Sequence, residues 1–137
     1  MGAAKALKAL AEIPPSKRDG KTEAAIKIGA EYFLKHHIYK QSHNPAIVSK
    51  PGWLKLGFPL MYQTDVLELF GILSALVYKD SRMQEAADLI VSKQDAEGRW
   101  KLESTFNGKT QTIIEHKSEP SKWITLKALT ALKHYYS

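Results

Sequence analysis

The sequence predicts an all-α protein of antiparallel helical hairpins, with one short β-hairpin near residues 100–115. Two observations lead to this fold class. Apolar residues recur at helical spacing in five segments bounded by caps or prolines, and those segments repeat at a period of about 60 residues. Because 137 residues suit one domain, we expect a single α/α-repeat domain over 1–137.

The five predicted helices alternate between inner and outer positions. They are expected at residues 3–12, 22–39, 65–78, 82–95 and 121–136. The helix at 65–78 is apolar nearly all round and should be buried. The helix at 22–39 has two apolar faces and should be covered on two sides. The helix at 82–95 has one apolar stripe, which includes Ile90 and Val91, and should lie outside with one face in solvent.

A small residue between two large ones recurs in the three predicted inner helices. The three sets are Leu7, Ala9 and Leu10, then Leu69, Gly71 and Ile72, then Leu129, Ala131 and Leu132. One repeat is thus an outer helix, a long loop and an inner helix. The chain then divides into the inner helix of a preceding repeat (3–12), a repeat at 22–78 and a repeat at 82–136.

Local signals mark where the predicted elements begin and turn. Asp65 and Glu68 have the spacing of a capping box, and Ser81 and Gln84 form a second such pair. The dipeptide at 107–108, Asn-Gly, lies between alternating apolar and polar residues, the commonest pattern for a two-residue β-hairpin turn.

The stretch QDAEGRW (94–100) follows the predicted helix at 82–95. Gly98 allows the chain to leave the helix in a left-handed conformation. The Gln94 amide can pair with helix-end groups of the neighbouring hairpin, and Trp100 offers a large surface to pack across that junction. This set contains no nucleophile or acid–base pair, so it predicts a structural role.

The same three residues resemble the glutamine–tryptophan repeat of squalene–hopene and oxidosqualene cyclases. The stretches SKWITLKALTAL (121–132) and FPLMYQTDVLEL (58–69) resemble inner-helix openings of the prenyltransferase/squalene-cyclase repeat superfamily. The resemblance implies an α/α toroid. A closed ring needs roughly five or six hairpins and this chain supplies about two and a half, so we expect an incomplete ring that belongs to a longer chain or closes by self-association.

The catalytic motifs of that superfamily are not found in this sequence. Its cyclases use a DxDD acid motif, whereas Asp65 stands alone and is better placed to cap a helix. Its protein prenyltransferases hold zinc with Asp, Cys and His, and this chain has no cysteine. We expect no metal or cofactor and a module that is non-catalytic by itself. The alternative is a fragment of a cyclase-like or prenyltransferase-like enzyme whose catalytic residues lie elsewhere.

Aromatic residues gather ahead of the predicted inner helices. They are Trp53, Phe58 and Tyr62 before the helix at 65–78, and Trp123 at the start of the last helix. With Lys55 they predict a pocket for a prenyl or terpenoid-like ligand bearing phosphate. In the alternative interpretation, these rings only pack the loop onto the hairpins.

The formal charge of +6 lies in the first part of the chain. Residues 32–64 contain no acid, which leaves open a third function, the binding of anions or nucleic acid, although no nucleic-acid motif accompanies the charge. The longest apolar run, 66–78, contains Glu68 and is too short to span a bilayer. The lack of cysteine and of a secretory signal fits a cytoplasmic protein.

Overall fold

The computed structural model describes residues 2–40, 44, 47–48, 51–60, 63–105 and 112–137. This part of the chain forms five α-helices: α1 (Gly2–Ala11), α2 (Gly20–Lys35), α3 (Val66–Ala75), α4 (Gln84–Ser92) and α5 (Lys122–Tyr136). Short 3-10 turns, η1 (Pro15–Lys17), η2 (Pro51–Leu54) and η3 (Ser81–Met83), lie in the connections. The all-α prediction is confirmed, and each expected helix exists with ends that differ by a few residues.

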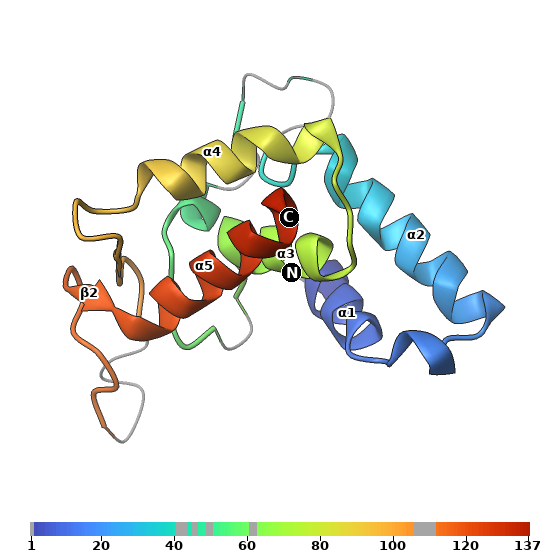
Figure 1. The fold of residues 1–137 in the computed structure, drawn as a ribbon, viewed down its shortest axis with the longest axis horizontal. Helices are drawn as coiled ribbons and strands as arrows, with labels where there is room; N and C mark the ends of the chain where they lie inside the picture. The colour runs from blue at the N-terminus through green and yellow to red at the C-terminus, as the bar shows by residue number, and fades with distance from the viewer. Residues whose placement is uncertain (1, 41–43, 45–46, 49–50, 61–62, 106–111) are drawn as a thin grey trace.

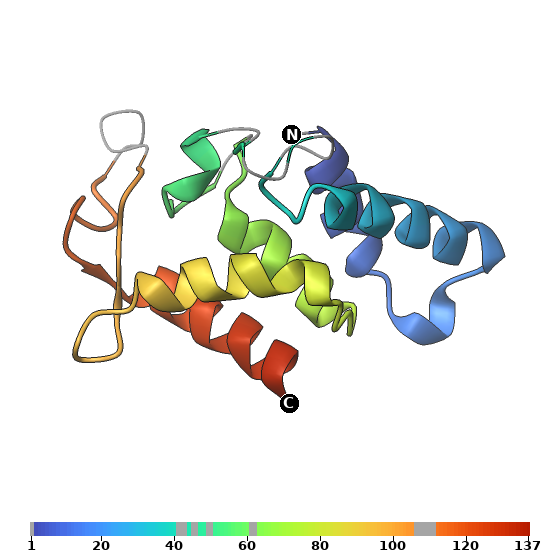
Figure 2. The ribbon, with the colours of Figure 1, turned by 90° about the horizontal axis from the view of Figure 1, so that it is seen from above.

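Helix α3 lies at the centre of the molecule, with α5 and α4 on one side and α1 and α2 on the other (Figures 1 and 2). Helices α3 and α5 run in the same direction. Phe58, just ahead of α3, stacks on Trp123 at the start of α5, and farther along Ala131 lies against Gly71. Helix α4 runs antiparallel to α5. This is seen where Gln84, at the start of α4, hydrogen-bonds Tyr135 and Tyr136 at the end of α5.

Side-chain caps lie at the start of α3 and at the turn before α4, and the second differs from the prediction. Asp65 accepts a hydrogen bond from the Glu68 N–H at 2.8 Å and caps α3 as expected. The predicted cap at Ser81 is wrong, because Asp80 accepts from the Arg82 N–H at 2.9 Å instead. The cap moves back by one residue because a 3-10 turn precedes α4.

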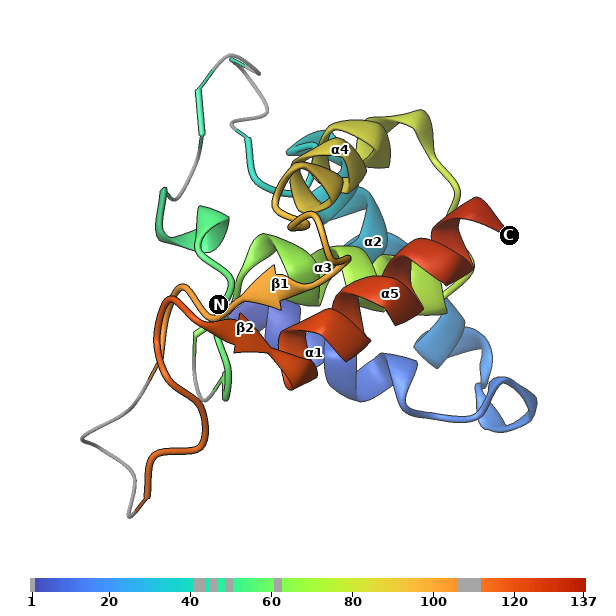
Figure 3. The ribbon, with the colours of Figure 1, turned by 60° about the vertical axis from the view of Figure 1, so that its left-hand side comes forward.

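Two short strands form an antiparallel ribbon beside the start of α5 (Figure 3). Strand β1 (Trp100–Lys101) pairs with β2 (Pro120–Ser121), with Trp100 opposite Ser121. The predicted ribbon is therefore present, with its second strand later in the chain than expected. The predicted turn at 107–108 lies outside the described residues.

Burial follows the prediction in α3 but only in part in α2. Seven of the ten α3 residues are buried, as the apolar composition of the segment predicts. In α2, Ile26, Ala30 and Leu34 are buried, whereas Ile28 and Tyr32 remain 73% and 54% exposed. The second predicted face is covered only in part, because Phe33 is buried and Gly29 lies against Leu7 of α1, whereas Ile28 and Tyr32 stay exposed. In α4, Ile90 is buried but Val91 is 44% exposed, so the predicted stripe is wrong at Val91.

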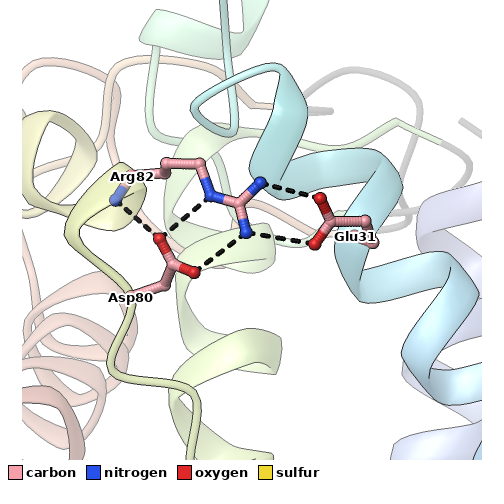
Figure 4. A network of polar contacts seen from close by, with 3 residues as sticks. All are labelled: Glu31, Asp80 and Arg82. Carbon is pink, nitrogen blue, oxygen red and sulfur yellow. Dashed lines mark hydrogen bonds and ion pairs between the residues drawn. The ribbon is translucent and has the colours of Figure 1, made fainter.

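A polar network on the surface joins α2 to the turn before α4 (Figure 4). The Arg82 guanidinium donates to both Glu31 oxygens, at 2.8 and 3.0 Å, and to both Asp80 oxygens, at 3.0 and 2.9 Å. Hydrogen bonds from Arg82 lower the pKa of Asp80 to about 2. The network fixes the orientation of α2 relative to η3 in a bidentate geometry that lysine could not reproduce.

Candidate functional site

A groove of about 480 Å³ runs between α1, α3 and α5. Its apolar wall comes mainly from residues of α3 and α5, and its charged residues come from all three helices. The apolar lining consists of Ala11 of α1 together with Leu67, Gly71, Ile72, Ala75, Leu126 and Ala131, and the ionisable lining of Lys8, Glu12, Glu68, Lys127 and His134. The groove exists because small residues at 71 and 131 let α3 and α5 approach closely, while α1 lies beside α3 on the other wall.

Two lysines at this groove have no ion-pair partner among the described residues. The Lys5 ammonium lies 2.8 Å from the Glu68 carboxylate, which is almost fully buried. Lys8 and Lys127 form no ion pair with any described residue. Glu12 also lines the groove and the Asp65 carboxylate acts on Lys127, so the two ammonium groups have acids in their surroundings but neither forms an ion pair with a described residue.

Lys127 lies where the groove meets the aromatic pair ahead of α3. Its ammonium is 5.1 Å from the Phe58 ring centroid, and Phe58 stacks on Trp123 with centroids 5.3 Å apart and planes 11° apart. Desolvation lowers the pKa of Lys127, and the nearby Asp65 carboxylate opposes that shift. A cation over an aromatic face, beside an apolar wall, can hold an anionic group next to a hydrocarbon.

Asp65, the one acid considered for catalysis, is buried and serves as a structural acceptor. One carboxylate oxygen accepts from the Glu68 N–H, and the other accepts from the Gly57 N–H at 3.0 Å. Burial raises the pKa of Asp65 to about 6, although both backbone N–H groups favour the ionised form. With both oxygens occupied, the side chain joins the loop before α3 to the start of that helix.

The structure separates the residues of the predicted ligand pocket. Phe58 and Trp123 stack beside Lys127, whereas Trp53 and Lys55 line a different cavity of about 260 Å³ with Thr64. Tyr62 lies outside the described residues. Ligand binding by this set therefore remains a prediction, and among its described members the Phe58–Trp123 pair is the one that lies beside a residue of the groove.

The predicted repeat motif forms the turn between α4 and β1. Trp100 is fully buried, its ring N–H donates to the Ile90 carbonyl at 2.8 Å, and its backbone N–H donates to the Thr125 hydroxyl. Gly98 has φ of +80°, the left-handed conformation that was expected. The Gln94 amide nitrogen lies 3.3 Å from where a Cβ on Gly98 would be, so this side chain packs on its own turn.

Sequence reasoning missed Lys127 and the ion pair between Lys5 and Glu68. Lys127 lies one helical turn after Trp123, so the i, i+4 spacing could have placed it beside the aromatic pair. No comparable signal links Lys5 to Glu68, because the two belong to helices far apart in sequence.

Three further findings concern metal sites, membrane-spanning helices and similarity to known proteins. Within the described ranges, no three His, Asp or Glu side chains are grouped as a metal site requires. None of the helices described is both long and apolar enough to cross a membrane. Comparison with protein-family models, curated proteins and solved structures finds no match.

Proposed function

We propose that the chain is an α/α-repeat binding module whose groove between α1, α3 and α5 binds an amphiphile. The hydrocarbon part would lie along the apolar wall of α3 and α5, and an anionic group would lie at Lys8 and Lys127. The observation that carries this proposal is the combination of the apolar lining with two lysines that form no ion pair with a described residue. A prenyl or terpenoid-like phosphate has this chemistry.

We further propose that the chain is a small or partial member of the prenyltransferase/squalene-cyclase repeat superfamily. Inner helices that run in the same direction, with an outer helix antiparallel to them, are what the resemblance of QDAEGRW leads us to expect. The alternative, an enzyme fragment, draws no support from Asp65, because both of its oxygens accept backbone hydrogen bonds.

Isothermal titration calorimetry with geranylgeranyl diphosphate and with the uncharged alcohol tests the proposal. We expect the diphosphate to bind more tightly, and Lys127→Gln to weaken the diphosphate while leaving the alcohol unchanged. Ala75→Phe should block both compounds, because Ala75 is an exposed residue that lines the groove.

Ala24→Phe provides the matched control, since Ala24 is an exposed helical alanine on α2 that does not line the groove. Binding should be unchanged in this variant. Absence of heat with both compounds, or equal binding by the Ala75→Phe and Ala24→Phe variants, would refute the groove as the binding site.

A further inference from the structure

The outward side of α5 carries large apolar residues that remain exposed, although the Tyr136 hydroxyl accepts a hydrogen bond from Gln84 of α4. Leu126, Leu129 and Tyr136 are 59%, 49% and 58% exposed. They lie on the side of the helix away from Ile124, Ala128 and Ala131, which are its buried residues. Of these three exposed residues only Leu126 also lines the groove.

The spacing of the exposed residues is that of a helix-packing seam. Lys122, Leu126, Leu129, Lys133 and Tyr136 follow one another at intervals of four, three, four and three residues. Such alternation brings side chains into one line along a helix and is the spacing of coiled-coil contact positions. We call these five residues the α5 seam.

Unpaired positive charge lies at both ends of the two leucines. From 120 to 137 the chain has no Asp or Glu, and Lys122 and Lys133 form no ion pair with a described residue. Lys133 follows Lys122 by eleven residues, which corresponds to about 16 Å along a helix. A partner that covers the leucines therefore meets a lysine at each end of them.

We propose that the α5 seam docks one amphipathic helix of an acidic partner. Leucine-sized residues of that helix would cover Leu126 and Leu129, and carboxylates at the same spacing would pair with Lys122 and Lys133. This mode buries the exposed apolar area and neutralises the two lysines in one contact.

Two other occupants fit the seam less well. The seam contains no acid. If the seams of two copies met, lysines would therefore lie against lysines whether the two α5 helices ran parallel or antiparallel. A membrane surface favours lysines along the border of a broad apolar face, whereas Lys122 and Lys133 lie within a seam of only three apolar residues. Complementary charge and the 4-3 spacing both favour an acidic helix.

The test uses a synthetic capped helical peptide in which Glu, Leu, Leu and Glu follow the same four-three-four spacing. Fluorescence anisotropy should show binding that weakens as salt is raised. The double variant K122E/K133E should bind about tenfold more weakly. A second peptide with Lys in place of Glu should prefer that variant over the unmutated protein, so that specificity is exchanged.

Matched variants separate the seam from the rest of the molecule. K27E/K35E makes the same change of charge on exposed lysines of α2 and should leave peptide binding unchanged. Leu129→Ser should abolish peptide binding and keep amphiphile binding, since Leu129 does not line the groove. Melting curves establish that each variant is folded. We expect all of them to fold, because the substituted residues are exposed.

Several outcomes would overturn the proposal. These are failure of the peptide to bind, failure of the charge exchange, light scattering that shows a dimer disrupted by Leu129→Ser, and tighter binding to phosphatidylglycerol vesicles than to the peptide. If the protein bound the peptide but not the amphiphile, the proposed function of the groove would be contradicted and the proposal for the α5 seam would stand.

Discussion

Helices α3 and α5 are both rich in apolar residues, yet they are buried to different extents. Seven of ten α3 residues are buried, against three of fifteen in α5. Helix α3 packs against α1, α4 and α5, whereas α5 packs mainly on α3 and the two-stranded ribbon and meets α4 at its last turn. The difference shows that apolar composition sets what a helix could bury, while the number of neighbours sets what it does bury. The remaining apolar residues of α5 stay exposed.

Two tryptophans on opposite sides of the α5 start give the largest expected contrast. Trp100 is fully buried and donates its ring N–H to the Ile90 carbonyl. Trp100→Ala should therefore lower the free energy of unfolding by about 3–5 kcal/mol. Urea denaturation measures this loss.

Trp123 provides the control, because it is 40% exposed and packs mainly on the Phe58 ring. Trp123→Ala should cost about 1 kcal/mol, the contribution of one aromatic pair. Equal losses for the two variants would contradict the contrast. Unchanged stability of Trp100→Ala with lost ligand binding would show that Trp100 serves the site and not the fold.

The cap at the start of α3 gives the next largest effect. Asp65→Ala removes an acceptor from the buried Gly57 N–H and from the Glu68 N–H, and should cost about 2 kcal/mol at low pH. Because the pKa of Asp65 is raised to about 6 in the folded state, the folded protein holds a proton that the unfolded chain has lost between about pH 4 and 6. The unmutated protein thus loses stability as pH rises through this window.

Comparison of the unmutated protein with the Asp65→Ala variant separates the titration of the Asp65 carboxyl from that of the other residues. The cost of Asp65→Ala, measured by denaturation at several pH values, should be greatest below pH 4 and smaller above pH 6. A cost that stays constant across this range would mean that the carboxyl is not buried as the structure shows.

The sequence predicted the parts of this fold that depend on one helix and its own caps. Burial of α3, the cap at Asp65 and the turn at Gly98 all follow from local chemistry. The exposed face of α2 at Ile28 and Tyr32 did not follow, because a periodic pattern marks which residues are apolar but not whether a neighbour covers them.

The sequence did not predict the groove, because none of the described residues of the predicted ligand pocket lines it. Phe58 and Trp123 were expected near each other and do stack, whereas Trp53 and Lys55 line another cavity. The groove depends on how three helices pack, and Lys5 reaches Glu68 only through that packing. Spacing along one chain segment contains no information about such a contact.

A hydroxyl inside α3 offers a change of opposite sign. Ser74 is buried and its hydroxyl oxygen has no hydrogen-bond partner among the described residues. Ser74→Ala should raise the free energy of unfolding by about 1 kcal/mol, since it removes a polar group that was desolvated without compensation. Thr130→Ala on the exposed side of α5 should change stability by less than about 0.5 kcal/mol. Destabilisation by Ser74→Ala would show that the hydroxyl has a partner.

The smallest expected effect concerns Asp80, the half-exposed counterpart of Asp65. Asp80→Ala should cost about 0.5–1 kcal/mol, because Asp80 caps the turn before α4 and pairs with Arg82. Ser81→Ala, which removes the cap that the sequence favoured, should change stability by only about 0.2–0.3 kcal/mol. Arg82 lowers the pKa of Asp80 to about 2, so its contribution is present above about pH 4 and is lost as pH falls toward 2. The stabilising contributions of Asp65 and Asp80 thus change in opposite directions with pH. Thermal melts of the Asp80→Ala and Ser81→Ala variants between pH 2 and 5 measure the contribution of Asp80. If Ser81→Ala is the more destabilising of the two, the cap assignment in this turn is wrong.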